Sequence, residues 1–237
     1  MKSNFVEQER RLAAALGLNR RPVAVTFADS IPPGIAAFAG SVPAGCSFWK
    51  IAAEGKTFHT IPGDHFNCAV GSHTHNIALP EARAHELGDT LTLMSGLGYI
   101  RIEEVPGILQ LPSTPAAIIF APLADSPVVP DAVIVCAKSV QLMLLTEAAG
   151  RAKSWSNLGM LFRPTCMGLP AALKHGTVAS AGCIGNRVYT GIGDDESYMF
   201  VPGRDLEKVI DELDTIVEAN ARLSEFHRGR LESLTVS

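Results

Sequence analysis

The segment from Arg163 to Glu196 concentrates residue types that bind metals and anions. It contains two cysteines, Cys166 and Cys183, each in a short stretch bounded by proline or glycine, and Arg187 and an acidic cluster follow closely. Thiolates are the ligands that soft metals prefer, and glycine lets the backbone approach a bound group without a side chain in the way. The segment therefore predicts a thiolate metal site, with an iron–sulfur cluster as the favoured occupant.

The chain has five cysteines, an odd number, and its first residues lack the apolar core of an export signal. A disulfide framework is therefore not expected, and reduced thiols would be available to a metal. Cys46 and Cys68 also lie near glycine, at expected turns or helix ends, whereas Cys136 lies inside an apolar run and is expected to be an inert buried thiol. Cys46, Cys68, Cys166 and Cys183 together give four thiols, which is the usual ligand count of a cluster.

Alternatives stay open for these thiols. No Cys-x-x-Cys pair is present, which weakens both the zinc-knuckle and the ferredoxin interpretations. Free cysteines are also often buried simply as small apolar side chains. Dispersed cysteines in glycine-rich turns suit a bulky cofactor whose sulfurs accept backbone N–H bonds, so a 4Fe–4S cluster is favoured and zinc is the alternative. The sequence does not decide whether three or four cysteines bind the cofactor.

Four further residues are candidates for catalysis. Arg187 could offset cluster charge or clamp a carboxylate or phosphate, or it could pair with the acidic cluster that contains Glu196. Glu196 could orient Arg187 or act as a general base, and structural pairing is the simpler interpretation. His73 and His75 lie in the polar segment 62–76 and could serve as ligands or proton donors, or could bond to backbone or water as ordinary loop residues.

The composition describes an ordinary folded protein. Of 237 residues, 47% are hydrophobic and 19% are charged, which allows one sizeable core. The net charge of -4 and the lack of a basic face give no reason to expect nucleic acid as a partner. No apolar run approaches the roughly 20 residues of a membrane helix. We therefore expect one cytoplasmic domain over residues 1–237, without a membrane segment.

Apolar runs predict a central sheet. Residues 116–120 and 132–136 do not alternate with polar residues, so both are expected to be central strands covered on each face. The second run leads into a nearly all-apolar helix over 140–149, and apolar residues at three- and four-residue steps over 206–223 predict an amphipathic C-terminal helix. This order predicts an α/β or α+β fold, as a single layered domain with a mixed central sheet flanked by helices.

The other expected elements are short. Helices are predicted over residues 5–18 and 46–54, and strands over 22–27, 56–61 and 198–201. The segment 62–76 is predicted to be irregular. A helix is expected to begin at Pro80 and to bury a stripe formed by Ala84, Leu87, Leu91 and Met94.

The cysteine turns and apolar runs together resemble the domain of unknown function 169 family, over about residues 22–203. The most specific element is Gly-Cys-x-Gly-x-Arg at 182–187, supported by the run 130–135 and by a glycine or proline after four of the cysteines. The resemblance implies that these four are the shared positions, Cys46, Cys68, Cys166 and Cys183, whereas Cys136 falls where an aliphatic residue is usual. The chain departs from the family in lacking the glycine pair that is usual after the Cys68 position. The resemblance supplies no reaction.

These observations favour an iron–sulfur enzyme that acts on a small, anionic substrate by lyase, desulfidase-type or redox chemistry. If three cysteines bind, one iron stays open as a Lewis acid, whereas four ligands would favour electron transfer or a structural role. The alternative is a non-catalytic metal-binding module, either a thiolate zinc site or a metal or sulfur sensor or carrier. The expected partner is a small-molecule substrate or a redox protein, and homodimer formation stays open.

Overall fold

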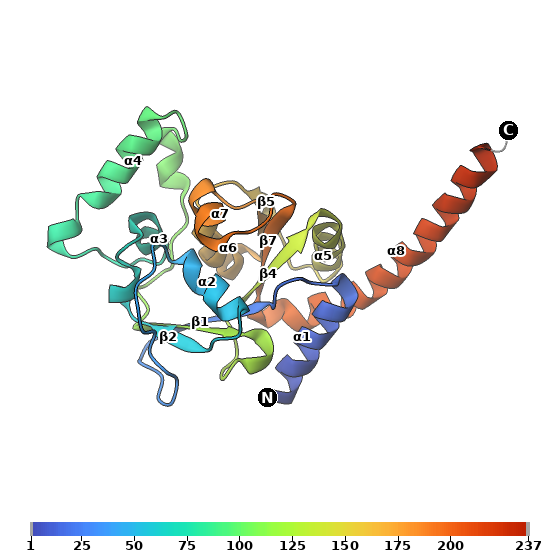
Figure 1. Cartoon of the computed structure of the whole chain (residues 1–237), viewed down its shortest axis with the longest axis horizontal. Coiled ribbons are helices and arrows are strands. Elements are labelled where there is room, and N and C mark those ends of the chain that lie inside the picture. The colour runs from blue at the N-terminus through green and yellow to red at the C-terminus, as the bar shows by residue number, and fades with distance from the viewer. Residues whose placement is uncertain (1, 236–237) are drawn as a thin grey trace.

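In the computed structural model, which describes residues 2–235, seven strands form one mixed sheet through the middle of the molecule (Figure 1). The strand order is β2-β3-β1-β4-β7-β6-β5, and all neighbours are antiparallel except β5 and β6, which are parallel. The predicted mixed sheet flanked by helices is confirmed. The strands are β1 (Val23–Ala28), β2 (Phe58–Thr60), β3 (Ala117–Pro122), β4 (Ala132–Lys138), β5 (Trp155–Leu161), β6 (Thr177–Ser180) and β7 (Glu196–Pro202).

The two uninterrupted apolar runs become β3 and β4, as predicted. Every residue of β3 is buried, and β4 lies in the middle of the sheet with its first four residues buried. Side chains alternate between the faces of a strand, so a strand buried along its whole length needs cover on both faces. Two separate hydrophobic cores provide that cover, one on each side of the sheet.

Three helices cover one face of the sheet: α1 (Lys2–Leu16), α5 (Ser139–Arg151) and α8 (Leu206–Thr235). Their apolar stripes meet the strands through residues such as Leu12, Leu145 and Leu213, which pack with Val133 and Met199. The predicted amphipathic C-terminal helix is confirmed and extends beyond residue 223. Among its described side chains the last buried one is Ile216, and the C-terminal part of the helix projects from the body of the molecule (Figure 1).

The opposite face carries α2 (Cys46–Ala53), α6 (Gly168–His175) and α7 (Ile184–Thr190). Phe48 of α2 stacks against Phe120 of β3 with ring centroids 5.5 Å apart, and Trp49 meets the ring of Phe200 edge-on at 5.6 Å. A Cβ atom added to Gly168 would lie 2.3 Å from the Phe200 ring, so α6 begins directly on that ring. This aromatic layer fixes the first turns of α2 and α6 against the sheet.

The segment 62–76 was predicted to be irregular, and that prediction is wrong. It contains a short 3₁₀ turn, Pro62–His65, and the helix α3 (Ala69–Thr74). The Cys68 sulfur caps α3 by accepting a hydrogen bond from the Gly71 N–H, and the Ser72 hydroxyl donates to the carbonyl of His65. Local caps of this kind hold a helix that is too short and too polar for its periodicity to reveal.

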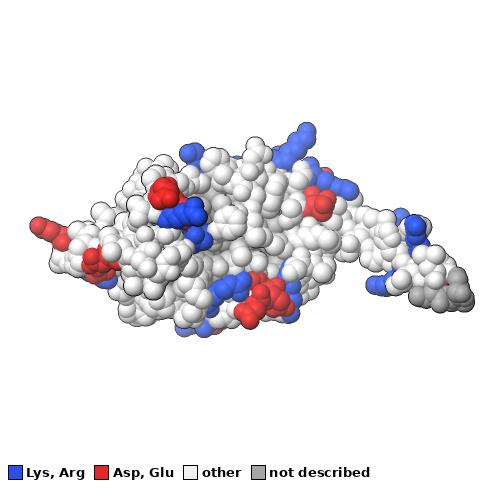
Figure 2. All heavy atoms as spheres, turned by 90° about the horizontal axis from the view of Figure 1, so that it is seen from above, with Lys and Arg blue, Asp and Glu red and all other residues white. Residues whose placement is uncertain are grey.

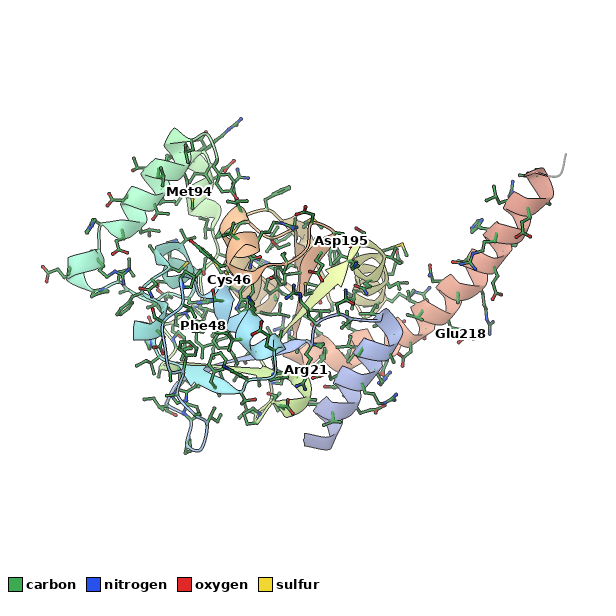
Figure 3. All side chains as sticks on the ribbon, in the orientation of Figure 1. Arg21, Cys46, Phe48, Met94, Asp195 and Glu218 are labelled. Atoms are coloured by element: carbon green, nitrogen blue, oxygen red, sulfur yellow. The ribbon has the colours of Figure 1, made fainter. Side chains whose placement is uncertain are left out.

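The helix expected to begin at Pro80 is also different. Only a 3₁₀ turn, Glu81–Arg83, follows Pro80, and α4 (Glu86–Gly96) begins later, followed by a second 3₁₀ segment, Ile102–Gly107. None of these three elements has a fully buried residue, so the predicted stripe does not face the core. Met94 can be located on α4 in Figure 3. We call residues 86–108 the cover segment.

Charges of both signs are interspersed on the face of the molecule seen from above (Figure 2). Figure 2 shows basic and acidic groups next to one another across a mostly uncharged face. Within residues 2–235, no helix is long and apolar enough to cross a membrane.

Candidate metal centre

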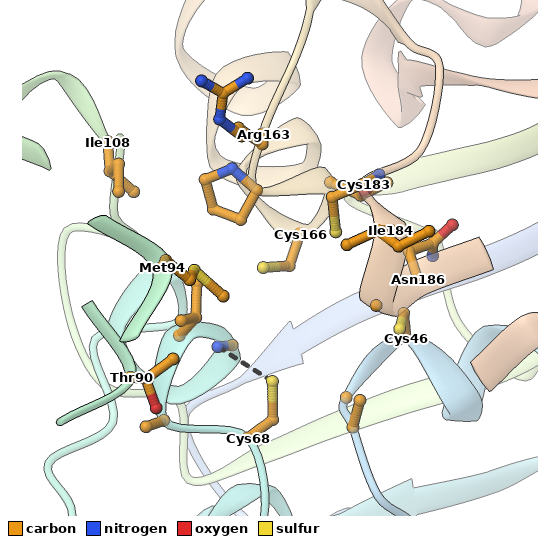
Figure 4. Close-up of a pocket in the computed structure, with 18 of the residues that line it drawn as sticks. Cys46, Cys68, Thr90, Met94, Ile108, Arg163, Cys166, Cys183, Ile184 and Asn186 are labelled. Atoms are coloured by element: carbon orange, nitrogen blue, oxygen red, sulfur yellow. Dashed lines mark hydrogen bonds between the residues drawn. The ribbon is translucent and has the colours of Figure 1, made fainter. Parts of the chain in front are cut away.

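A cavity of about 300 Å³ lies between the cover segment and the starts of α2, α3, α6 and α7. Four of the five cysteines line it: Cys46, Cys68, Cys166 and Cys183. Figure 4 shows their side chains disposed around a common space. The fifth cysteine, Cys136, lies on β4 and does not line this cavity.

Each of the four cysteines lies at the beginning of a helix. Cys46 is the first residue of α2, and Cys68 and Cys183 are the residues that precede α3 and α7. Cys166 belongs to the 3₁₀ turn that leads into α6, in the crossover between the parallel strands β5 and β6. The first N–H groups of a helix have no partner within the helix, so these positions place free donors close to sulfur.

Backbone N–H groups surround the sulfur of Cys68. The Gly71 N–H donates to it at 3.3 Å, and the Gly45 backbone also lowers the pKa of this thiol through a hydrogen bond. A Cβ on Gly71 would lie 3.0 Å from the sulfur, so glycine is needed for this approach. The segment that bears Cys183 is tied to the turn that bears Cys166, because the Cys183 N–H donates to the Thr165 hydroxyl at 2.6 Å.

Burial and mutual repulsion favour the neutral form of three of the cavity thiols, those of Cys46, Cys68 and Cys166. Burial raises the pKa of Cys46 to about 12, and it raises the pKa of Cys166 well above the ordinary thiol value. Burial also raises the pKa of Cys68, and this effect outweighs the backbone hydrogen bonds that lower it. The negative charge that neighbouring thiolates would carry raises all three pKa values further. Four anionic sulfurs can therefore share this space only if a cationic group replaces their protons.

Within residues 2–235, no group of three or more His, Cys, Asp or Glu side chains is placed so as to hold a single metal ion. The four thiols instead line the walls of the cavity, on four separate helix starts. Their donor chemistry suits a soft metal, and their arrangement suits a group large enough to reach several walls at once.

Arg187 and Glu196, two predicted catalytic residues, do not line the cavity. The Arg187 guanidinium donates to three backbone carbonyls: those of Gly193 at 3.0 Å, Glu196 at 2.9 Å, and Ala181. The Glu196 carboxylate accepts from the Gly193 N–H at 2.8 Å and lies 3.5 Å from Arg20. These contacts tie the start of β7 to the loop that precedes Cys183, so the structure gives both side chains a positioning role.

The two histidines predicted as catalytic also lie outside the cavity lining. His73 is half-buried in α3, and its Nδ1 lies 3.0 Å from the Gln110 amide. His75 is fully buried, and its ring meets that of His65 edge-on with centroids 5.6 Å apart. Neither ring nitrogen of His75 has a hydrogen-bond partner. Burial lowers the pKa of both predicted histidines, to about 4 for His75.

The cavity lining also includes polar residues that were not predicted as catalytic, among them Arg163 and Asn186. Asn186 is 2% exposed, and its amide approaches the Cys46 thiol without completing a hydrogen bond of regular geometry. Arg163 lies beside Tyr99 and Glu104 of the cover segment. The sequence signal for Asn186 is its place three residues after Cys183, on the first turn of α7. Nothing in the sequence favours Arg163 over Arg187.

The fold and the site together define an α+β protein with a four-cysteine cavity on one face of its sheet. The chain belongs to the DUF169 family, described as uncharacterised ArCR, whose model matches residues 11–212. The match includes all four cavity cysteines and the whole sheet. No curated protein and no solved structure matches the chain.

Proposed function

We propose that this chain is an iron–sulfur protein whose four cavity cysteines, Cys46, Cys68, Cys166 and Cys183, hold a 4Fe–4S cluster, and that it is an enzyme acting on a small anionic substrate. One observation carries the proposal: four thiols from four distant parts of the chain line one cavity. A buried thiol needs no other thiol beside it to be stable, so the convergence of four favours a shared ligand over separate burial.

Three features support a cluster over a single zinc ion. The cavity volume of about 300 Å³ is that of a small-molecule site. The thiols lie around its walls rather than as a group placed to hold one ion, among residues 2–235. Backbone N–H groups of Gly71 and Gly45 approach the Cys68 sulfur, and such bonds tune the sulfurs of iron–sulfur clusters.

The chain's own residues can prepare this cavity for a reaction. When bound through three cysteines, a 4Fe–4S cluster supplies a Lewis-acidic iron for lyase or desulfidase-type chemistry, and through four it supplies a redox centre. Arg163 offers positive charge to an anion in the cavity, and Asn186 offers an amide beside Cys46. The apolar side chains of the cover segment exclude water from this space. A reducing, cytoplasmic compartment would keep the thiols available.

The first test is composition. Protein purified without oxygen should contain iron and acid-labile sulfide in equal amounts, near four of each per chain, with broad visible absorption. Colourless protein that carries one zinc per chain would overturn the cluster and support the alternative, a thiolate zinc module. Protein without any bound metal after reconstitution with iron and sulfide would overturn both.

The second test assigns the ligands. Cys46→Ala, Cys68→Ala, Cys166→Ala and Cys183→Ala should each lower the iron content. The matched control is Cys136→Ala, because Cys136 is a half-buried thiol whose pKa burial raises to about 12, yet it lies outside the cavity. Full iron content in one of the four variants would remove that residue from the ligand set and leave a three-cysteine cluster. Equal iron loss in the Cys136 variant would show that the loss reports general destabilisation.

A further inference from the structure

Arg163 stands out among the residues of the cavity because its guanidinium is only partly engaged. One of its terminal nitrogens, Nη2, lies 3.2 Å from the Glu104 carboxylate. Its Nε is buried and has no hydrogen-bond partner. Nε and Nη2 form one edge of the guanidinium, and a carboxylate binds that edge best through two parallel hydrogen bonds. Glu104 therefore accepts from only one of the two donors on this edge, Nη2, and leaves Nε for a second hydrogen bond.

The contact between Arg163 and Glu104 is easy to exchange. The two side chains are 34% and 48% exposed, and a single ion pair at this level of exposure contributes little to stability. The Arg163 guanidinium also lies over the Tyr99 ring, 5.0 Å from its centroid, and the Tyr99 hydroxyl accepts from the Ile184 N–H at 3.2 Å. These contacts connect the cover segment to the rim that bears Cys183.

The cover segment is weakly anchored elsewhere. Neither α4 nor the following 3₁₀ segment has a fully buried residue, and Leu93, Leu97 and Ile102 are 63%, 74% and 54% exposed. Elements with few buried side chains open at low free-energy cost. The cover can therefore shift away from Arg163 without disturbing either hydrophobic core, and such a shift exposes the Nε that Glu104 leaves unused.

The side of the cover segment that lines the cavity favours a ligand with an apolar hydrocarbon part. The residues that it contributes to the cavity are predominantly apolar: Leu91, Met94, Ile100, Val105 and Ile108. Arg163 is on the facing wall, and no lysine lines the cavity within residues 2–235. A ligand that satisfies both walls has one anionic end and a short hydrocarbon body.

We propose that this cavity binds a small carboxylate with an apolar body, which replaces Glu104 on Nε and Nη2 of Arg163 beneath the cover segment. The inference deepens the proposed function, and it rests on that function for the statement that the ligand is a substrate. Arg163 is the anion-recognition residue, and Glu104 is a resident carboxylate that keeps the site closed until the ligand arrives.

The test uses protein purified without oxygen and titration calorimetry with straight and branched carboxylates of three to six carbons, among them 4-methylpentanoate. At least one should bind, and its neutral amide should bind at least about tenfold more weakly, because the amide lacks the charge that Arg163 recognises. Arg163→Gln should weaken carboxylate binding at least about tenfold, and Arg163→Lys should restore only part of it, since lysine cannot bind at two points.

Glu104→Gln should tighten carboxylate binding roughly twofold to fivefold, because the exchanged ion pair is weak. The matched control is Glu103→Gln, since Glu103 is an exposed neighbour that does not line the cavity. The inference is overturned if no carboxylate of the series binds, if the amide binds equally well, or if Arg163→Gln binds like the wild type. Such a result with iron content intact leaves the cluster standing, whereas Arg163-dependent binding by protein that takes up no iron on reconstitution overturns the cluster alone.

Discussion

Lowering the pH from 7 to 5 should remove a large part of this protein's stability, because two histidines are buried in neutral form. His65 ends the 3₁₀ turn that precedes α3, His75 directly follows α3, and each is 1% exposed. Only one of their four ring nitrogens has a hydrogen-bond partner, the Nε2 of His65 beside the Thr60 hydroxyl at 2.8 Å. Burial lowers the pKa of His65 to about 3 and that of His75 to about 4.

The sign follows from proton uptake. In the unfolded chain both histidines have a pKa near the ordinary value of about 6.5. Below that pH the unfolded chain binds protons that the folded chain refuses, so stability present above pH 6.5 is lost as the pH falls toward the folded values. At pH 5 each histidine is about 1.5 pH units below its unfolded pKa, which corresponds to about 2 kcal/mol each and about 4 kcal/mol for the pair.

The pH window isolates the histidines from other groups. The pKa values of Cys46, Cys68 and Cys166 are raised, so these thiols stay protonated in folded and unfolded chains alike between pH 5 and 7. The surface carboxyls with lowered pKa, such as that of Asp195 beside Lys138, lose their contribution only at lower pH. Loss of stability between pH 7 and 5 therefore reports imidazoles: His65 and His75, with a further contribution from the half-buried His73, whose pKa burial also lowers.

The assay is urea unfolding of metal-free protein at pH 7 and pH 5, followed by circular dichroism at constant ionic strength. His75→Leu should remove about half of the pH dependence, because one of the two buried imidazoles is gone. The ring nitrogens of His75 make no hydrogen bond that the variant would lose. His227→Leu is the control, since His227 is an exposed histidine on α8 and should leave the dependence unchanged. An unchanged slope in the His75 variant would refute the argument that burial keeps this ring neutral.

Three other outcomes are expected. Gly168→Ala should lower the free energy of unfolding in urea by about 1–3 kcal/mol, because the new methyl would lie 2.3 Å from the buried Phe200 ring. An unchanged unfolding midpoint would mean that α6 can move away from the ring. Metal-free protein should lose stability as the pH rises above about 9, because burial raises the folded pKa of Cys46 to about 12 while the unfolded thiol ionises earlier. Melting at pH 8 and 10 checks this. Cys46→Ala should reduce the dependence without abolishing it, since the pKa values of Cys68, Cys136 and Cys166 are also raised. Removal of residues 222–237 should change the unfolding free energy by less than about 0.5 kcal/mol, since Ile216 is the last buried side chain of α8, and a larger loss in urea would contradict this.

The sheet was predictable where burial leaves a direct mark on the sequence. The runs that form β3 and β4 are apolar without alternation because both faces of the sheet are covered. The apolar repeat of α8 was equally clear, because a long helix samples its period several times. Short elements such as β6 and α7 sample too few residues for any period to emerge.

The cover segment shows why periodicity has limits. Leu91 and Met94 belong to one apolar face of α4, and the sequence correctly indicates that they share it. An apolar face can turn toward a hydrophobic core or toward a cavity, and the pattern of residues is the same in both cases. Only the chain's path decides between the two, and here the path places both side chains over the cavity.

The candidate site was partly visible for a related reason. Glycine and proline beside the four cysteines mark the places where helices begin, which is where the structure puts these thiols. The sequence did not indicate which of the two arginines, Arg163 or Arg187, would face the cavity. Arg187 turns to three carbonyls, whereas Arg163 faces the cavity, and local sequence does not record the direction of a side chain that bonds to distant backbone.

The spacing of the four thiols has a consequence for how the protein matures. Cys46 is made early, while Cys183 emerges from the ribosome only after most of the sheet has been synthesised. A chain that ends before residue 183 therefore presents at most three of the sulfurs and lacks α7 and β7. A centre held by all four sulfurs can be completed only after most of the chain has been synthesised.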